Sequence, residues 1–121
     1  MPAKVVDASV LAALIFREPR ADVAAALLKG NELNAPRLMA YEMTRIAQKK
    51  ATQVPNQRSE FQEALEVALL MDIRWWDVSH SAVMRLALET GLTTYDSCYL
   101  YLSKLLGAEL ATFDEELGRA G

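Results

Sequence analysis

The stretch KVVDASVLAALIFR, residues 4–17, decides the fold class of this chain. Lys4 to Asp7 predicts a short buried strand, because Val5 and Val6 are β-branched and a long apolar segment follows at once. Ser9 to Arg17 then predicts a helix. A buried strand that passes directly into a helix, with the acid Asp7 at the junction, is typical of an α/β active site.

The same alternation of strands and helices continues along the chain. Because strands separated by helices pair in parallel through right-handed crossovers, the sequence predicts a mainly parallel sheet with helices on both faces. Ligands of such sheets bind beyond the carboxyl ends of the strands. The further predicted strands are Leu33 to Ala35, Ile73 to Val78 and Glu109 to Thr112, and the further predicted helices are Ala21 to Lys29, Leu38 to Lys50, about Asn56 to Met71, one capped by Ser79 that runs to about Glu89, one capped by Thr94 that runs to about Leu106, and Glu115 to Arg119.

Length and composition predict one compact domain that covers residues 1–121. The chain has 121 residues, is 52% hydrophobic and 24% charged, and is too short for two ordinary domains. The apolar run from Ala8 to Phe16 falls far short of the roughly 20 residues that span a bilayer, so we expect no contact with a membrane. Cys98 is the only cysteine and cannot form an internal disulfide, which favours a cytoplasmic protein.

The charge pattern limits the contacts that the chain can make with nucleic acid. Its formal net charge is -3, so a polyanionic partner needs a local basic face. Such a face is predicted between residues 37 and 58, where Glu42 is the only acid among five basic residues. Within it, Arg45, Lys49 and Lys50 are the candidate RNA contacts, and a solvated helix face is the alternative explanation.

Four carboxylates lie inside or beside apolar stretches: Asp7, Glu42, Asp96 and Asp114. A buried carboxylate must be paired, bound to a metal or neutralised, so these positions are unusual for isolated charges. Asp7 ends the first predicted strand and Asp114 follows the last one, which places both at the carboxyl edge of the sheet. Glu42 lies on the apolar stripe of its helix, and Asp96 lies in the first turn of another.

Local explanations exist for three of these acids. Asp7 and Asp114 can each cap the helix that follows, because an aspartate side chain accepts hydrogen bonds from free backbone N–H groups there. Asp96 gains from the helix dipole at the start of its helix. Caps and dipoles therefore remain open for each of them by itself.

Glu42 has a salt bridge as its alternative, either with Arg45 one turn along its helix or with Arg37. If the four acids meet, however, repulsion rules out a bare cluster. Two like charges about 4 Å apart repel by roughly 4 kcal/mol at an effective dielectric constant of about 20. Protons or divalent cations must then screen them, and ligands that are all oxygen favour Mg²⁺ or Mn²⁺ over zinc. Such acid clusters support phosphoryl chemistry.

Four segments in order resemble a PIN domain, and specifically a VapC-type toxin of a toxin–antitoxin pair. They are VVDASV (residues 5–10), AYEMTRIAQKK (40–50), LTTYDSCYLYLSKLLG (92–107) and ELATFDEEL (109–117). Each segment alone is weak evidence, but the four together span essentially the whole chain. The resemblance implies an α/β/α sandwich and a metal-dependent endoribonuclease that hydrolyses RNA phosphodiester bonds. It also implies Mg²⁺ or Mn²⁺ as cofactor, an RNA substrate, a cognate antitoxin protein and a homodimer.

The resemblance also assigns roles to residues of this sequence. Asp7 and Asp96 match the principal metal ligands, and Glu42 and Asp114 would complete the acidic pocket. Two hydroxyl residues match supporting positions, Thr112 before the last acid and Ser9 shortly after the first.

One departure from the family pattern affects the sheet. Similar domains continue past the last acid through a helix into a further strand, whereas only residues 115–121 follow here. We therefore expect a short sheet of four strands without the fifth, and an exposed edge at Glu109 to Thr112.

Two other functions remain open at this point. One is a catalytically idle PIN-like module that binds RNA or a protein, although the intact set of four acids argues against it. The other is an unrelated Mg²⁺-dependent phosphotransfer protein, such as a phosphatase or receiver domain with Asp7 as phosphate acceptor. Receiver domains need a lysine near the strand ends and an acidic pair beside the acceptor, and the sequence shows neither.

Overall fold

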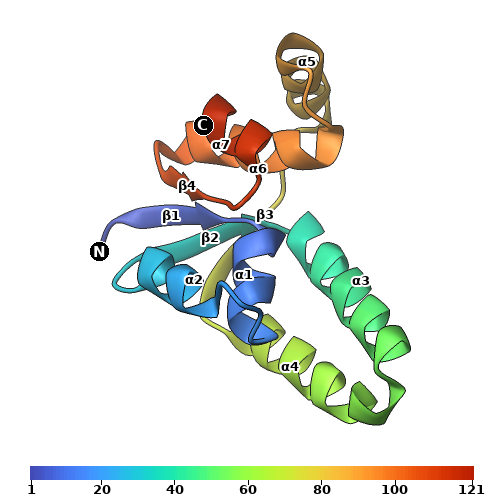
Figure 1. Cartoon of the computed structure of the whole chain (residues 1–121). Coiled ribbons are helices and arrows are strands. Elements are labelled where there is room, and N and C mark those ends of the chain that lie inside the picture. Colours follow the sequence, from blue (N-terminus) through green and yellow to red (C-terminus); the bar gives the residue numbers. More distant parts are fainter.

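The computed structural model describes all residues from 1 to 121. Its strands form one four-stranded sheet in the order β3-β2-β1-β4, and every neighbouring pair is parallel. The predicted sheet of four parallel strands is confirmed, with β4 at an edge (Figure 1). The strands are β1 (Ala3–Val6), β2 (Glu32–Pro36), β3 (Ile73–Trp76) and β4 (Glu109–Ala111).

Helices cover both faces of this sheet, so the α/β/α architecture is also confirmed (Figure 1). On one side, α1 packs against α2 and against the long hairpin of α3 and α4; on the other, α6 lies across β1, β2 and β4, with α5 and α7 beside it. The helices are α1 (Ala8–Ile15), α2 (Ala21–Leu28), α3 (Leu38–Gln53), α4 (Arg58–Leu70), α5 (His80–Thr90), α6 (Thr94–Leu106) and α7 (Glu115–Ala120), and a 3₁₀ turn, η1 (Pro55–Gln57), joins α3 to α4.

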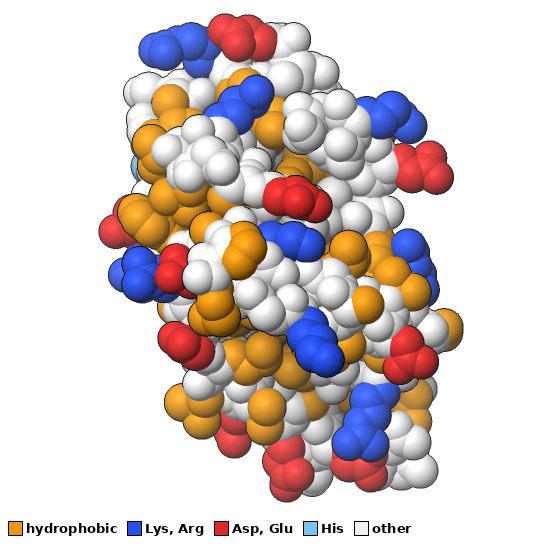
Figure 2. All heavy atoms as spheres, turned by 90° about the vertical axis from the view of Figure 1, so that its left-hand side faces the viewer, with side chains coloured by type: hydrophobic (Ala, Val, Ile, Leu, Met, Phe, Trp, Pro, Cys, Tyr) orange, Lys and Arg blue, Asp and Glu red, His pale blue; other side chains and the backbone are white.

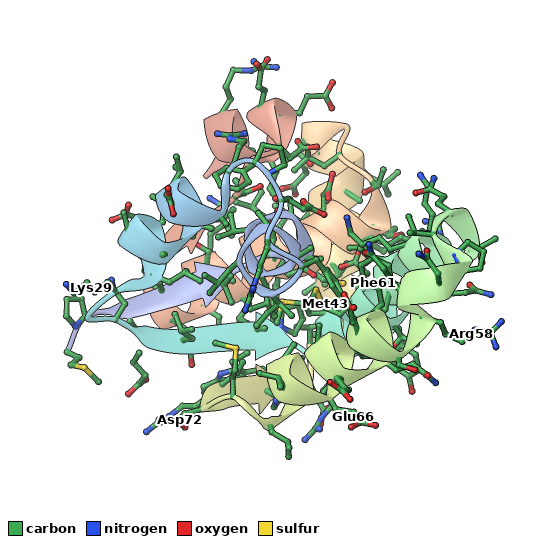
Figure 3. All side chains as sticks on the ribbon, turned by 60° about the horizontal axis from the view of Figure 1, so that its bottom comes forward. Lys29, Met43, Arg58, Phe61, Glu66 and Asp72 are labelled. Carbon is green, nitrogen blue, oxygen red and sulfur yellow. The ribbon has the colours of Figure 1, made fainter.

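One cluster of 20 buried hydrophobic residues forms the core. Val5 and Val6 of the inner strand β1 are fully buried, as their β-branched side chains between two helical layers predict. Met43 of α3 lies near the centre of the molecule, whereas Arg58 and Glu66 of α4 point outward (Figure 3). Both helical layers therefore share one core with the sheet.

Side-chain hydrogen bonds cap the N-termini of four helices, α1, α5, α6 and α7, and one predicted cap is wrong. The Ser79 hydroxyl accepts a hydrogen bond from the Ala82 N–H at 3.2 Å, as predicted. The cap of α6, however, is Thr93 and not Thr94. Thr93 has the extended backbone that a cap needs, and its hydroxyl accepts from the Asp96 N–H at 3.0 Å. Either of two adjacent threonines satisfies the sequence pattern, so only the backbone conformation distinguishes them.

Charged side chains are spread over the surface. On the face that Figure 2 shows, basic and acidic side chains alternate between apolar patches and form no continuous basic area. This distribution agrees with the formal net charge of -3. The structure contains no helix with the length and apolar character required to cross a membrane.

Candidate active site

Asp7 lies where β1 ends and α1 begins, and it is the N-cap of α1. Its Oδ1 accepts hydrogen bonds from the Val10 N–H at 3.1 Å and from the Ser9 hydroxyl at 2.6 Å. Its Oδ2 accepts from the Thr112 hydroxyl. The residue is only 5% exposed, and burial raises the pKa of its carboxyl although the hydrogen bonds from Ser9 and Thr112 lower it. The capping explanation is therefore correct but incomplete, because a cap does not need this burial.

Both predicted supporting hydroxyls contact Asp7 and continue into the chain after β4. Ser9 donates to Asp7 and accepts from the Phe113 N–H at 3.0 Å. Thr112 also donates to Asp7 and accepts from the Asp114 N–H at 2.9 Å. Since a hydroxyl has one donor and two acceptor sites, each residue orients the Asp7 carboxylate and fixes the following loop at once.

Glu42 reaches the site from α3, and its partner is a residue that sequence reasoning missed. The Tyr99 hydroxyl of α6 donates a hydrogen bond to Glu42 Oε1. Tyr99 is only 2% exposed, and burial and the charge of Glu42 raise its pKa, so the phenol keeps its proton and remains a donor. The sequence contained one indication of this role: Tyr99 lies three residues after Asp96, on the same side of the helix.

The salt-bridge alternative for Glu42 is wrong. Arg37 pairs with Asp77 instead, with Nε and Oδ1 3.0 Å apart. Arg45 forms no ion pair within 4.0 Å, although its charge lowers the Glu42 pKa somewhat. Burial, together with the charges of Asp7 and Asp96, outweighs this effect and raises the pKa of Glu42.

Asp96 is partly buried in the first turn of α6, and its charge interacts with those of the other acids. Burial raises its pKa, and the charges of Asp114 and Asp7 raise it further. Glu116 of α7 adds a smaller repulsion, and the sequence pattern did not single out this residue.

Asp114 is exposed and is the N-cap of α7, where its Oδ1 accepts from the Leu117 N–H at 2.9 Å. The capping explanation is again correct locally. Among the charges that raise the pKa of Asp96, that of this carboxylate has the largest effect. At the carboxyl edge of the sheet, the charges of Asp7 and Asp96 thus act on the pKa of Glu42, and those of Asp7 and Asp114 act on the pKa of Asp96.

Comparison with known proteins shows the family of this chain. The family model of the PIN domain matches residues 4–121. The chain belongs to the PIN-domain family. Ribonuclease VapC3 of Pyrobaculum aerophilum is 31% identical over 124 aligned residues, which cover 93% of this chain and 90% of that protein. The predicted resemblance is therefore confirmed.

Solved structures of other proteins share the fold of this PIN domain. PAE2754 from Pyrobaculum aerophilum superposes with a TM-score of 0.80 at 27% identity, over 98% of this chain and 79% of that chain. VapC20 of Mycobacterium tuberculosis, a toxin that cleaves the sarcin–ricin loop, gives 0.71 at 15% identity, over 98% and 95%. VapBC2 of Rickettsia felis, bound to a DNA fragment from its promoter, gives 0.67 at 16% identity, over 98% and 92%.

The acids of this PIN domain have the donor chemistry of a hard cation site but not a closed coordination shell. All their donors are carboxylate oxygens, which suit Mg²⁺ or Mn²⁺. No group of three or more His, Cys, Asp or Glu side chains is arranged so as to hold an ion. The charges of these acids raise the pKa values of Glu42 and Asp96, yet the side chains are not arranged around one ion. Both findings hold together because charges interact over longer distances than those of metal coordination. The hydrogen bonds from Ser9, Thr112 and Tyr99 hold two of them in place.

The predicted basic residues differ in their surroundings. Arg45 and Lys49 are exposed and form no ion pair within 4.0 Å. Lys50 is partly buried, pairs with Glu18 at 2.7 Å and lies 5.7 Å from the ring centre of Phe16. Lys50 thus joins α3 to the segment after α1, whereas the other two are free to contact a polyanion.

Proposed function

We propose that this PIN domain is a Mg²⁺- or Mn²⁺-dependent endoribonuclease that acts as the toxin of a toxin–antitoxin pair. One observation carries the proposal: burial raises the pKa of Asp7, Glu42 and Asp96, repulsion by neighbouring acids raises it further for Glu42 and Asp96, and no lysine or arginine forms an ion pair with any of the three. A divalent cation is the counter-charge that such a group lacks. The names of the relatives, Ribonuclease VapC3 and the toxin VapC20, support RNA as the substrate class.

Asp7 and Asp96 are proposed as the principal ligands, with Glu42 and Asp114 completing the acidic pocket. When bound, the cation supplies Lewis-acid activation of water and of the phosphodiester. Hydrolysis then needs no covalent bond to a side chain of the chain. A phosphotransfer protein that modifies Asp7 is less well supported, because Asp7 has no lysine partner.

Hydroxyl groups of the chain favour the ionised form of two of these carboxylates and fix their orientation. Ser9 and Thr112 donate to the two oxygens of Asp7, which opposes its protonation and fixes its rotamer. Tyr99 has the same effect on Glu42. Groups that are fixed before substrate arrives do not have to be reorganised during the reaction. Arg45 and Lys49 are proposed to contact phosphates of the RNA.

Purified protein with total RNA tests the proposal, with Mg²⁺ or Mn²⁺ and with a chelator. We expect cleavage only with the cation and none by Asp7→Asn. The matched control is Asp72→Asn, which removes an exposed carboxylate directly before β3, at the opposite end of the strand from the carboxyl edge; Asp72 lies at the periphery of the molecule (Figure 3). Cleavage that persists in Asp7→Asn or in chelator contradicts the metal-nuclease assignment.

A cognate antitoxin, a homodimer and a cytoplasmic location are further parts of the proposal. The VapBC2 complex supports the antitoxin as a partner. Exposed apolar side chains such as Leu70 on α4 and Leu88 on α5 support association with other chains. Light scattering of the purified protein measures its mass, and a monomer at micromolar concentration contradicts the homodimer.

A further inference from the structure

A pocket lined by aromatic rings lies beside the acids. Its volume is about 740 Å³, within the range of small-molecule sites. It is open to solvent and is lined by the start of α3, the end of β3, α5 and the beginning of α6. Three of its lining residues are Tyr41, Trp76 and Tyr95. None of these three contributes to the acidic site described above.

The pocket and the acids share two helices. Tyr41 directly precedes Glu42 on α3, and Tyr95 directly precedes Asp96 on α6. The hydrogen bond from Tyr99 to Glu42 joins the two helices between them. Cys98, another lining residue, has its pKa raised by burial and by the charge of Glu42. The pocket therefore borders the two helices that carry Glu42 and Asp96, although none of the four acids lines it.

The two tyrosine rings of the pocket are exposed and can contact a ligand. Tyr41 is 77% exposed and Tyr95 is 61% exposed, although large rings are normally covered. The Trp76 N–H already donates to Asn34 Oδ1 at 2.9 Å, so its edge is fixed and satisfied. At the rim, Arg37 pairs with Asp77 at 3.0 Å, and both side chains are exposed. An exposed ion pair contributes little, so this guanidinium can turn to a phosphate.

We propose that this pocket binds one unpaired nucleobase of the RNA, at a nucleotide next to the phosphodiester that is cut. The inference rests on the proposed function and narrows its substrate to single-stranded or looped RNA, since a base inside a duplex is stacked and paired. Flat aromatic rings accept any base by stacking, and a neighbouring cation suits the attached phosphate. The strand would then run from the Arg37 rim across Tyr95 to the acids.

Nucleoside 5′-monophosphates probe the pocket without any nuclease activity. Trp75→Phe leaves Trp76 as the only tryptophan, so its fluorescence can be titrated with AMP or UMP in the presence of a chelator. We expect saturable quenching, and binding about 5- to 150-fold weaker after an additional Tyr95→Ala change. Leu105→Ala, which removes another exposed apolar side chain of α6, is the matched control and should have no effect. Absence of saturable quenching, or quenching unchanged by Tyr95→Ala, overturns the proposal.

Cleavage kinetics test the position of the base. Each enzyme receives an oligoribonucleotide with either a normal or an abasic nucleotide beside the cut. We expect the abasic site to lower kcat/KM about 5- to 150-fold for the wild type and to have little further effect on Tyr95→Ala. If the abasic nucleotide lowers kcat/KM by the same factor in the wild type and in Tyr95→Ala, the ring does not contact the base.

The two experiments separate the possible failures. If the wild type cleaves no RNA, the proposed function fails, and the quenching titration still decides whether the pocket binds a base. The exposed Met84 of α5 also lines this pocket and would suit a second copy of the chain. If Tyr41→Ala halves the mass of the protein while quenching is unchanged, the face is an interface between copies and the base pocket is rejected.

Discussion

Tyr99→Phe removes one buried hydroxyl and leaves the ring and the packing of α6 intact. The lost interaction is the hydrogen bond to Glu42, whose carboxylate is partly buried. Hydrogen bonds to charged groups contribute about 1.5–3 kcal/mol, and water can replace part of this one. We therefore expect the free energy of unfolding of the metal-free protein to fall by about 1–2 kcal/mol. With about 2 cal/mol/K of unfolding entropy per residue, this corresponds to a decrease in Tm of about 4–8 °C.

The loss of stability in Tyr99→Phe should depend on pH. The hydrogen bond from Tyr99 lowers the Glu42 pKa, so its loss raises that pKa further. The deficit of the variant is fully present while Glu42 is ionised, and it shrinks as the pH falls through the Glu42 pKa towards its ordinary value of 4.5. Urea unfolding over a series of pH values measures both effects. A titration with Mn²⁺ should in addition show weaker binding, because Glu42 is no longer held in place.

Tyr95→Phe is the matched control for this experiment. It removes the same atom from the same helix, but the Tyr95 side chain is largely exposed and its hydroxyl has no hydrogen-bond partner in the chain. We expect its stability to change by less than about 0.5 kcal/mol. The reasoning is refuted if Tyr99→Phe is as stable as the wild type at neutral pH, or if its deficit does not decrease when Glu42 is protonated.

Three further predictions concern the acidic site and the basic face of α3. Asp7→Asn should stabilise the metal-free protein at neutral pH. Because the Asp7 pKa is raised in the folded state, the free energy of unfolding of the wild type falls as the pH rises through that pKa. Urea unfolding in chelator should therefore show a smaller difference between acid and neutral pH for the variant. Thr112→Val should lower the free energy of unfolding by about 1–3 kcal/mol, because it leaves an oxygen of Asp7 and the Asp114 N–H without their partner. Thr112→Ser keeps the hydroxyl and should keep most of the stability. Equal stability of the two variants would contradict the contact. Lys49→Ala should weaken RNA binding uniformly across sequences and reduce the salt slope of the logarithmic binding constant by about 0.7, and an unchanged slope in filter binding shows that Lys49 contacts no phosphate.

Short-range patterns were sufficient to predict the fold and the positions of the acids. The β-branched pair Val5 and Val6 predicted an inner strand, and that strand is fully buried. An acid at the end of a parallel strand must lie at the carboxyl edge of the sheet, so Asp7 and Asp114 could be placed as soon as the strands were recognised. The roles of these acids as helix caps were equally visible, because a cap depends only on residues three positions apart.

Only the tertiary structure decided which side chains hold these acids. From the sequence, Glu42 had Arg45 and Arg37 as partners because they are neighbours along the chain, yet its partner Tyr99 lies 57 residues away. Thr112 donates to Asp7 across 105 residues, a contact that exists because β4 pairs directly with β1. Periodicity shows which face of a helix is buried but not which other element covers it. The sequence alone therefore determined the sheet and its acidic edge, and the packing of α6 and of the loop after β4 determined how each carboxylate is fixed.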